Sequence, residues 1–183
     1  MSDTASNKLL LLGVFAIVIA LIATACTRPR KDYQPDQPLN FSHYIHSGQH
    51  EIACQYCHTA PAMGRHSTVP SLDICMNCHK YVSVDKPAII ELTKKYNEGT
   101  PIEWTKVHDL PDFAYFNHQP HVAHFLKKDG NDKPGQLQGV CSNCHGEVNS
   151  VEKVATMNEF NMGWCVNCHR QNEAPLNCTT CHR

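Results

Sequence analysis

The clearest hydrophobic pattern lies at the start of the chain, where residues 9–25 form an apolar run of 17 residues that includes one polar residue, Thr24. Only Lys8 precedes the run closely. A membrane-spanning helix needs about 20 apolar residues, so this run is near the short limit. We predict that residues 1–26 form an N-terminal membrane anchor.

Two other fates compete with retention of this segment. The chain could be cleaved after the small-x-small sequence that ends at Ala25, or Cys26 could carry a lipid. Ala23 weakens the lipoprotein interpretation, because a larger aliphatic residue is usual there. The basic residues that follow the run oppose the positive-inside tendency of an N-in helix; they are Arg28, Arg30 and Lys31. On length and flanks we favour retention.

Few regular elements are predicted after the anchor. Prolines at 29, 35 and 38 make residues 27–40 an extended tether. Residues 86–97 carry apolar positions at helical spacing, and Gly99 just beyond them favours a helix end there. No segment alternates convincingly as a strand. We expect residues 41–183 to be largely irregular, with short helices.

Five segments of that region share the sequence Cys-x-x-Cys-His, which is the attachment signature of a c-type haem. In each, two thiols form thioether bonds to the porphyrin and the histidine becomes the proximal iron ligand. These attachment motifs, numbered one to five along the chain, are Cys54/Cys57/His58, Cys75/Cys78/His79, Cys141/Cys144/His145, Cys165/Cys168/His169 and Cys178/Cys181/His182. They use ten of the 11 cysteines and leave only Cys26.

Zinc or disulfide chemistry fits these motifs poorly. Neither requires a histidine directly after the second cysteine, and zinc ribbons pair their Cys-x-x-Cys units, whereas five is odd. The chain has only 6 Phe and 2 Trp, so it lacks material for an ordinary core. We predict a multihaem cytochrome c fold: mostly irregular, with short α-helices wrapped round five covalently bound haem c groups. The net charge of −1, with no basic stripe, excludes a nucleic-acid footprint.

An internal repeat organises the motifs. Residues 41–46 recur as residues 116–121, and two attachment motifs follow each copy. The second copy is 12 residues longer, and the excess falls in a polar, loop-like segment at 126–137. The pattern predicts a duplicated two-haem unit, spanning 41–79 and 116–169. The fifth motif, at 178–182, is appended at the end.

Eight of the 13 histidines lie outside the motifs and are candidates for the second axial position. The repeat supplies four: His43, His46, His118 and His121. The fifth distal ligand is either His108 or Met162, whose thioether would raise the haem potential. His50 and His124 break the repeat and are expected to be ordinary surface histidines, with His66 intermediate.

These residues also resemble a known family. A Phe-x-His-x-x-His block ahead of Cys-x-x-Cys-His resembles the class III multihaem cytochromes c. More specifically, residues 102–122, 69–79 and 162–165 resemble the pentahaem cytochrome c subunit of alternative complex III, a quinol-oxidising respiratory assembly. The resemblance covers about residues 40–170. A related subunit, usually with six haems, serves a quinone reductase complex of sulfate reducers.

The resemblance implies a relay with no catalytic residue of its own. Quinol would be oxidised at a polytopic quinol-binding membrane subunit, and electrons would pass through an iron–sulfur subunit related to molybdopterin oxidoreductases. This chain would hand them to a mono-haem cytochrome c or a terminal oxidase. It also implies His43, His46, His108, His118 and His121 as distal ligands, with Met162 a sixth candidate. Haem attachment outside the cytoplasm would place this domain on the periplasmic face of the inner (cytoplasmic) membrane.

Two other function classes stay open. A membrane-anchored quinol dehydrogenase feeding a periplasmic reductase would need its own contact with quinol. A multihaem reductase of nitrogen or sulfur oxyanions would need one iron with an open sixth position. Distal candidates outnumber the five motifs, which argues against the enzyme.

Overall fold

The computed structural model describes residues 11–19, 31–128 and 137–183. The chain divides into two units, Met1–Arg30 and Lys31–Arg183. In the first unit, residues 11–19 form a helix whose apolar side chains, such as Phe15, are exposed. Across the three described ranges, no helix is both long and apolar enough to cross a membrane.

The rest of the predicted anchor, the cleavage site ending at Ala25 and the lipidation candidate Cys26 lie outside the described residues. The same holds for most of the predicted loop at 126–137. The membrane anchor, and the alternatives of cleavage after Ala25 or lipidation of Cys26, therefore stay predictions.

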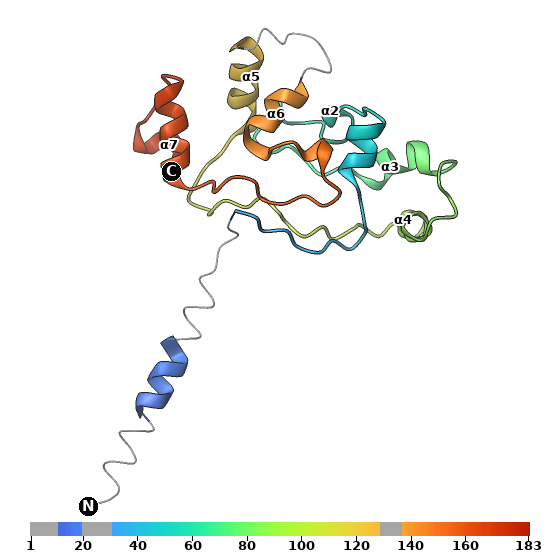
Figure 1. Ribbon diagram of the computed structural model, residues 1–183, viewed down its shortest axis with the longest axis horizontal. Helices are drawn as coiled ribbons and strands as arrows, with labels where there is room; N and C mark the ends of the chain where they lie inside the picture. Colours follow the sequence, from blue (N-terminus) through green and yellow to red (C-terminus); the bar gives the residue numbers. More distant parts are fainter. Residues whose placement is uncertain (1–10, 20–30, 129–136) are drawn as a thin grey trace, which may run out of the picture. The chain divides into compact units, whose positions relative to one another are not determined.

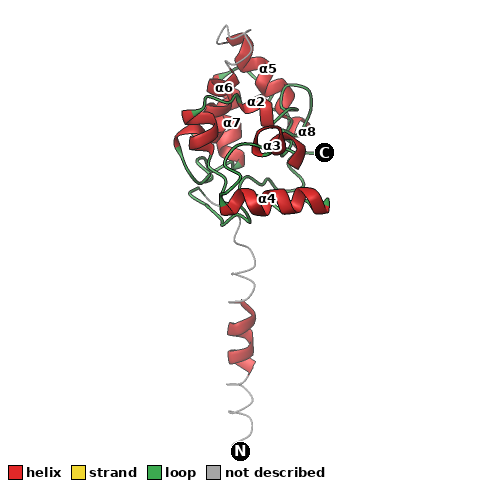
Figure 2. Cartoon of the chain, turned by 90° about the vertical axis from the view of Figure 1, so that its right-hand side faces the viewer, coloured by secondary structure: helices red, strands yellow, loops and turns green. Residues whose placement is uncertain are grey.

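The second unit consists of short helices joined by irregular segments (Figures 1 and 2). In chain order they are η1 (Tyr44–Gln49, a π-helix), α2 (Cys54–Cys57), α3 (Leu72–His79), α4 (Pro87–Glu98), α5 (His118–Lys128), α6 (Leu137–His145), η2 (Val148–Ser150, a 3₁₀ turn), α7 (Met162–Gln171) and α8 (Cys178–Cys181). No strand occurs among the residues that the structure describes. The expected mixture of short helices and irregular chain is confirmed for this part of the molecule.

Helix α4 contains no attachment motif, and its start and end follow from the residues at its own termini. The sequence predicts a helix over 86–97, and the structure shows Pro87–Glu98. Pro87 suits the first turn, because the missing N–H would have no helical partner there. Gly99 ends the helix with φ 65°, and its N–H donates to the carbonyls of Lys95 and Tyr96. Leu92 is buried, and α4 packs against α3.

The attachment motifs are built on helices. In α3 and α6 the motif ends the helix at its histidine, whereas α2 and α8 consist of the Cys-x-x-Cys core alone. In α7 the motif lies inside the helix, which begins with Asn161 as N-cap and continues to Gln171. A single helical turn places both cysteines of a motif on one side, as two thioether bonds to one porphyrin require.

The apolar core of the described domain is small. Its main cluster lies between α5 and α6, where Val122, Leu137 and Val140 are buried. Partly buried Ala62, Phe125 and Leu126 pack against this cluster. Such a core agrees with the low content of large apolar residues in the sequence.

The two copies of the repeat make the same backbone contact with each other. In the first copy the Tyr44 N–H donates to the Val151 carbonyl (3.1 Å), and Val151 lies six residues after His145. In the second copy the Gln119 N–H donates to the Gly64 carbonyl (3.2 Å), and Gly64 lies six residues after His58. Helices α2 and α6 also touch. The first residues of each copy are therefore hydrogen-bonded to the segment that follows the first attachment motif of the other copy.

Candidate haem-binding sites

The motif histidines share one hydrogen-bond pattern. Four of the five donate their Nδ1–H to a backbone carbonyl: His58 to Thr68 (2.6 Å), His79 to Val82 (3.0 Å), His169 to Pro175 (2.7 Å) and His182 to Phe113 (2.9 Å). A carbonyl only accepts, so Nδ1 carries the proton and Nε2 keeps its lone pair. Metal-ligating histidines are usually oriented in this way.

The repeat histidines are held similarly. His46 donates to the carbonyl of Ser42 (2.8 Å) and His121 to that of Asn117 (2.7 Å), each four residues earlier. His118 donates to the carbonyl of Arg65 (2.8 Å). The corresponding Nδ1 of His43 is buried and has no partner among the described residues.

Three pairs of rings have the spacing expected across one iron. The ring centroids are 6.0 Å apart for His46 and His79, 5.9 Å for His121 and His169, and 6.4 Å for His118 and His145. A ligating imidazole nitrogen lies about 2 Å from a zinc ion, and a similar bond to iron places two imidazoles on opposite sides roughly 6 Å apart. Each pair joins one repeat histidine to one motif histidine.

The fourth repeat histidine completes the pattern. Burial, with smaller effects from the nearby His58 and His46, lowers the pKa of His43 to about 4. His43 therefore lies near His58 of the first motif, although within the described residues no close ring pair joins them as one joins His118 to His145. Burial likewise lowers the pKa of His145 to about 3. Both are neutral imidazoles at neutral pH, which is the form that binds a metal.

Two phenylalanines of the repeat orient these rings, a role that the sequence analysis missed. Phe41 stacks on His46 at 4.4 Å and meets His43 edge-on at 4.8 Å. Phe116 makes the equivalent contacts with His121 at 4.5 Å and His118 at 4.8 Å. The available signal was the phenylalanine two residues before the first histidine in each copy.

The motif cysteines are all free thiols, so none of these ten forms a disulfide. Cys54 and Cys141, the first cysteines of the first and third motifs, contact each other. Their hydrogen bond raises the pKa of Cys141, as does burial, and lowers the pKa of Cys54. Burial raises the pKa of Cys144 to about 11, with smaller effects from Cys168 and Cys165. With two thiols beside each histidine, the donor set fits a c-type haem.

The motif cysteines differ in their exposure to solvent. Cys78 of the second motif and Cys178 of the fifth are exposed, whereas the other eight are partly buried. The sequence predicts the same attachment role for Cys78 and its partner Cys75. In the structure Cys75 is partly buried, whereas Cys78 is exposed. Cys78 still lies near the first motif, because it is among the thiols that raise the pKa of Cys57, after burial and Cys75. Thioether attachment at all ten cysteines, including the exposed Cys78 and Cys178, stays a prediction from spacing.

The motifs are neighbours in a defined spatial order. The Asn77 side chain of the second motif donates to the Tyr56 hydroxyl of the first (3.1 Å). The first motif meets the third where α2 touches α6. Helix α5 links the third to the fourth, because it carries both His118 and His121. The fifth follows the fourth, since Cys181 lies near Cys165. The order in space is second, first, third, fourth, fifth.

Within the described residues the fifth motif, like the first, has no histidine ring pair at this spacing. Its histidine, His182, lies against Phe113 (centroids 5.9 Å apart), and the Tyr115 N–H donates to the Cys181 carbonyl (2.8 Å). Within the described residues, no histidine ring faces His182 at roughly the 6 Å spacing set by two metal–imidazole bonds. Met162, one of the two predicted alternatives, is exposed at the start of α7.

His108, the other alternative, lies beside the third motif. Its Nε2 is 3.4 Å from Nδ1 of His145, and the two rings are perpendicular with centroids 4.5 Å apart. His50 and His124, expected to be ordinary surface histidines, are exposed, and so is His66, which was set apart as intermediate.

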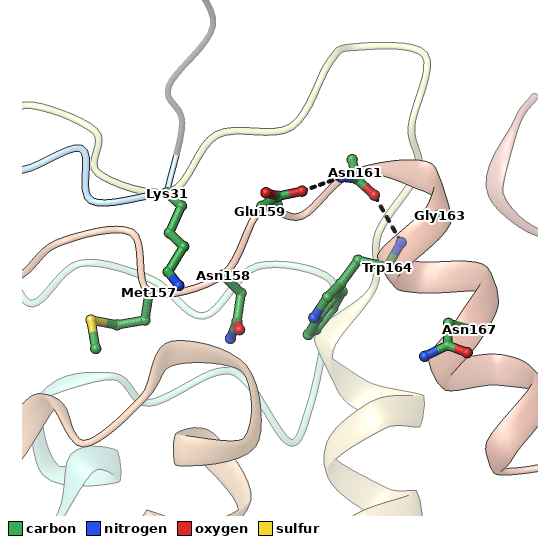
Figure 3. A pocket seen from close by; sticks show the side chains of 8 residues that line it. All are labelled: Lys31, Met157, Asn158, Glu159, Asn161, Gly163, Trp164 and Asn167. Atoms are coloured by element: carbon green, nitrogen blue, oxygen red, sulfur yellow. Dashed lines mark hydrogen bonds between the residues drawn. The ribbon is translucent and has the colours of Figure 1, made fainter.

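A polar cavity lies beside the fourth motif, and sequence reasoning did not predict it. It measures about 410 Å³ and is lined by Lys31, Met157, Asn158, Glu159, Asn161, Gly163, Trp164 and Asn167 (Figure 3). Asn161 shapes its rim: Oδ1 accepts from the Trp164 N–H (2.8 Å), and Nδ2 donates to Glu159 (2.7 Å). The sequence signal was an asparagine at the N-cap position of α7.

Comparison with known proteins gives a match over nearly the whole chain. No family model matches the chain. The chain is 28% identical over 188 aligned positions to the protein named menaquinone reductase, multiheme cytochrome c subunit, from Nitratidesulfovibrio vulgaris. The alignment covers 91% of this chain and 87% of that protein.

Proposed function

We propose that this chain is the electron-transfer subunit of a membrane-bound, quinone-linked oxidoreductase complex and that it binds five c-type haems. The observation that carries the proposal is the pairing of repeat and motif histidines at 5.9–6.4 Å. The similarity to a multihaem cytochrome subunit over nearly the whole chain supports it. A bound c-type haem supplies an iron that takes up and releases one electron.

Three ring pairs, together with the neighbouring His43 and His58, would give axial ligands for four haems. His43, His46, His118 and His121 would be the distal ligands opposite His58, His79, His145 and His169, in that order. Each haem would then have both axial positions filled by this chain. That arrangement suits electron transfer, because it leaves no position on the iron for a substrate.

For the fifth haem we propose His182 and Met162. Met162 lies one helical turn before Cys165 on α7, and side chains three apart share a helix face. Cys165 in turn lies near Cys181 of the fifth motif. A thioether ligand would give this haem, at the end of the spatial order, the highest potential.

In the proposed complex, electrons enter and leave at the two ends of this order. The second motif, on α3, and the fifth, on α8, are the terminal ones. As in alternative complex III, quinol would be oxidised at a polytopic membrane subunit, and an iron–sulfur subunit related to molybdopterin oxidoreductases would deliver the electrons. A mono-haem cytochrome c or a terminal oxidase would receive them. The haem domain would lie on the outer face of the inner membrane, anchored by residues 1–26.

The reverse direction is the second candidate. The relative from Nitratidesulfovibrio vulgaris is named a menaquinone reductase subunit, which favours electron flow toward quinone. The same residues would serve either direction, because two imidazoles can bind haem iron in both its oxidation states.

The test is purification of this chain from native membranes in mild detergent, followed by mass spectrometry of the proteins that accompany it. The proposal expects an iron–sulfur protein and a polytopic quinone-binding subunit. Recovery of the chain alone, or with only a periplasmic reductase, would overturn it.

The same preparation distinguishes the two directions. In a quinol-oxidising complex, added menaquinol reduces the haems. In a quinone-reducing complex, menaquinol leaves them oxidised, and added menaquinone oxidises haems that have been reduced beforehand.

A further inference from the structure

One motif histidine differs from the others in its Nδ1 partner. The four histidines described above donate to backbone carbonyls, but Nδ1 of His145 faces Nε2 of His108 at 3.4 Å. His108 comes from an irregular segment 37 residues earlier in the chain. In the third motif, therefore, the hydrogen-bond partner of the histidine Nδ1 is a side chain and not a backbone carbonyl.

The direction of this hydrogen bond follows from the ligand role of His145, so the inference rests on the proposed function. A histidine that binds iron through Nε2 carries its proton on Nδ1. Nδ1–H of His145 is then the donor and Nε2 of His108 the acceptor. His108 must accordingly carry its own proton on Nδ1.

The spacing separates this arrangement from axial ligation. The His108 and His145 rings are perpendicular at 4.5 Å, short of the roughly 6 Å that a metal between two imidazoles requires. The ring of His118 already lies 6.4 Å from His145 and within 9° of parallel. His118 thus has the geometry expected of the distal ligand, whereas His108 lies at the edge of the His145 ring that carries Nδ1.

The surroundings hold His108 in place. The Thr156 side chain is 4% exposed, and its hydroxyl donates to the carbonyl of Val107, the preceding residue (2.8 Å). Thr156 is itself fixed by backbone hydrogen bonds to Asp32 and Tyr33. The Phe160 ring meets His108 edge-on at 5.7 Å.

We propose that His108 is a positioning residue for the third haem and not one of its axial ligands. It accepts a hydrogen bond from His145, fixes the plane of that ring and increases its donor strength toward iron. A stronger donor stabilises ferric iron, so His108 lowers the reduction potential of this haem. The third haem is the middle one in the spatial order, where its potential affects transfer in either direction.

The test compares His108→Phe, His108→Gln and the control His124→Phe in the full-length holoprotein. Phenylalanine removes the acceptor and keeps an aromatic ring, whereas glutamine places an amide oxygen near the lost Nε2. His124 is exposed, with its Nε2 3.4 Å from the side-chain oxygen of Asn172 and its ring edge-on to Phe125. The readouts are the low-temperature EPR spectrum and the midpoint potential of each haem.

We expect His108→Phe to keep every wild-type low-spin signal and to raise the potential of one haem. His108→Gln should restore that potential toward the wild-type value, and His124→Phe should change none. A new high-spin signal in either His108 variant would overturn the proposal, because it would identify His108 as an iron ligand. Unchanged potentials in His108→Phe would also overturn it.

A failure of the proposed function has a different signature. It would appear in the wild-type protein, as missing c-type haem absorbance or missing partner subunits. The effect of His108 is instead the difference in potential between variant and wild type in the same preparation, so it can be absent while the haems and partners are all present.

Discussion

The imidazole rings of His46 and His79 lie 6.0 Å apart, and those of His121 and His169, at the equivalent positions of the repeat, lie 5.9 Å apart. Both repeat histidines donate to the carbonyl four residues earlier, and each packs against a phenylalanine: His46 is stacked on Phe41, and His121 is tilted by 34° against Phe116. Two separate stretches of sequence thus build the same paired arrangement. Its spacing is that of two ligands on one metal, which links the repeat to the proposed electron transfer.

Removing one distal histidine should open one iron. In His46→Ala or His121→Ala, one haem loses its second imidazole while its thioether bonds and proximal histidine remain. We expect an unchanged haem content and the conversion of one low-spin EPR signal into a high-spin signal.

The matched control is His50→Ala, because His50 is an exposed histidine close to the first copy of the repeat. Its spectrum should equal that of the wild type. If the His46 and His121 variants also stayed fully low-spin, the ligand assignment from ring spacing would be wrong.

Loss of both thiols of the third motif should remove one haem from the middle of the relay. We expect the double variant Cys141→Ala/Cys144→Ala to bind four haems, measured as covalent haem mass by intact-protein mass spectrometry. Electron transfer through the purified complex should fall to a small fraction of the wild-type rate, because the third motif joins the first to the fourth.

Cys26→Ala provides the comparison, since Cys26 is the one cysteine outside the motifs. It should retain five haems. A double variant that kept the wild-type rate would show that electrons do not pass the third motif.

The buried hydroxyl of Thr156 should contribute to stability. Thr156→Val leaves the partly buried Val107 carbonyl without its donor. A fully buried acceptor left unsatisfied costs about 1–3 kcal/mol, so the loss here should lie at the lower end. We expect a lower Tm in thermal unfolding of the holoprotein. Thr105→Val is the control, because Thr105 is exposed and its hydrogen bond with Gln37 uses only the backbone. Equal melting temperatures for the two variants would contradict the role given to Thr156.

Gly99 should be needed for its backbone conformation alone. At φ 65° an alanine is strained by about 1 kcal/mol, whereas a Cβ there would meet no atom within 4 Å. Gly99→Ala should lower the Tm modestly and leave the haem spectra unchanged. Gly64→Ala, where a Cβ also meets no atom within 4 Å and φ is not positive, should have a smaller effect. A larger loss at Gly64 would contradict this explanation.

Local sequence rules predicted the local parts of this structure well. The helix around Leu92 was placed to within one residue at each end, because apolar spacing and Gly99 act on neighbours in the chain. The attachment motifs are predicted from spacing alone, because a thioether-bound porphyrin requires that spacing.

The long-range contacts were not predictable in the same way. Nothing in the sequence around Cys54 indicates that it meets Cys141, and the repeat by itself does not show that each copy anchors the other. Spacing also treats Cys75 and Cys78 alike, although only Cys75 is partly buried. The placement of His108 at the Nδ1 edge of His145 depends on Thr156, which lies 49 residues after Val107. Such contacts form when segments far apart in the sequence pack together. The hydrophobic periodicity of a single segment does not predict them.

Low-temperature EPR of the wild-type complex tests the central claim most directly, which is that this chain relays electrons and offers no iron to a substrate. The account predicts five low-spin haems and no high-spin signal in the oxidised protein, unchanged after nitrite or sulfite is added. A stoichiometric high-spin haem that shifts on binding such an anion would contradict the relay and identify an enzyme.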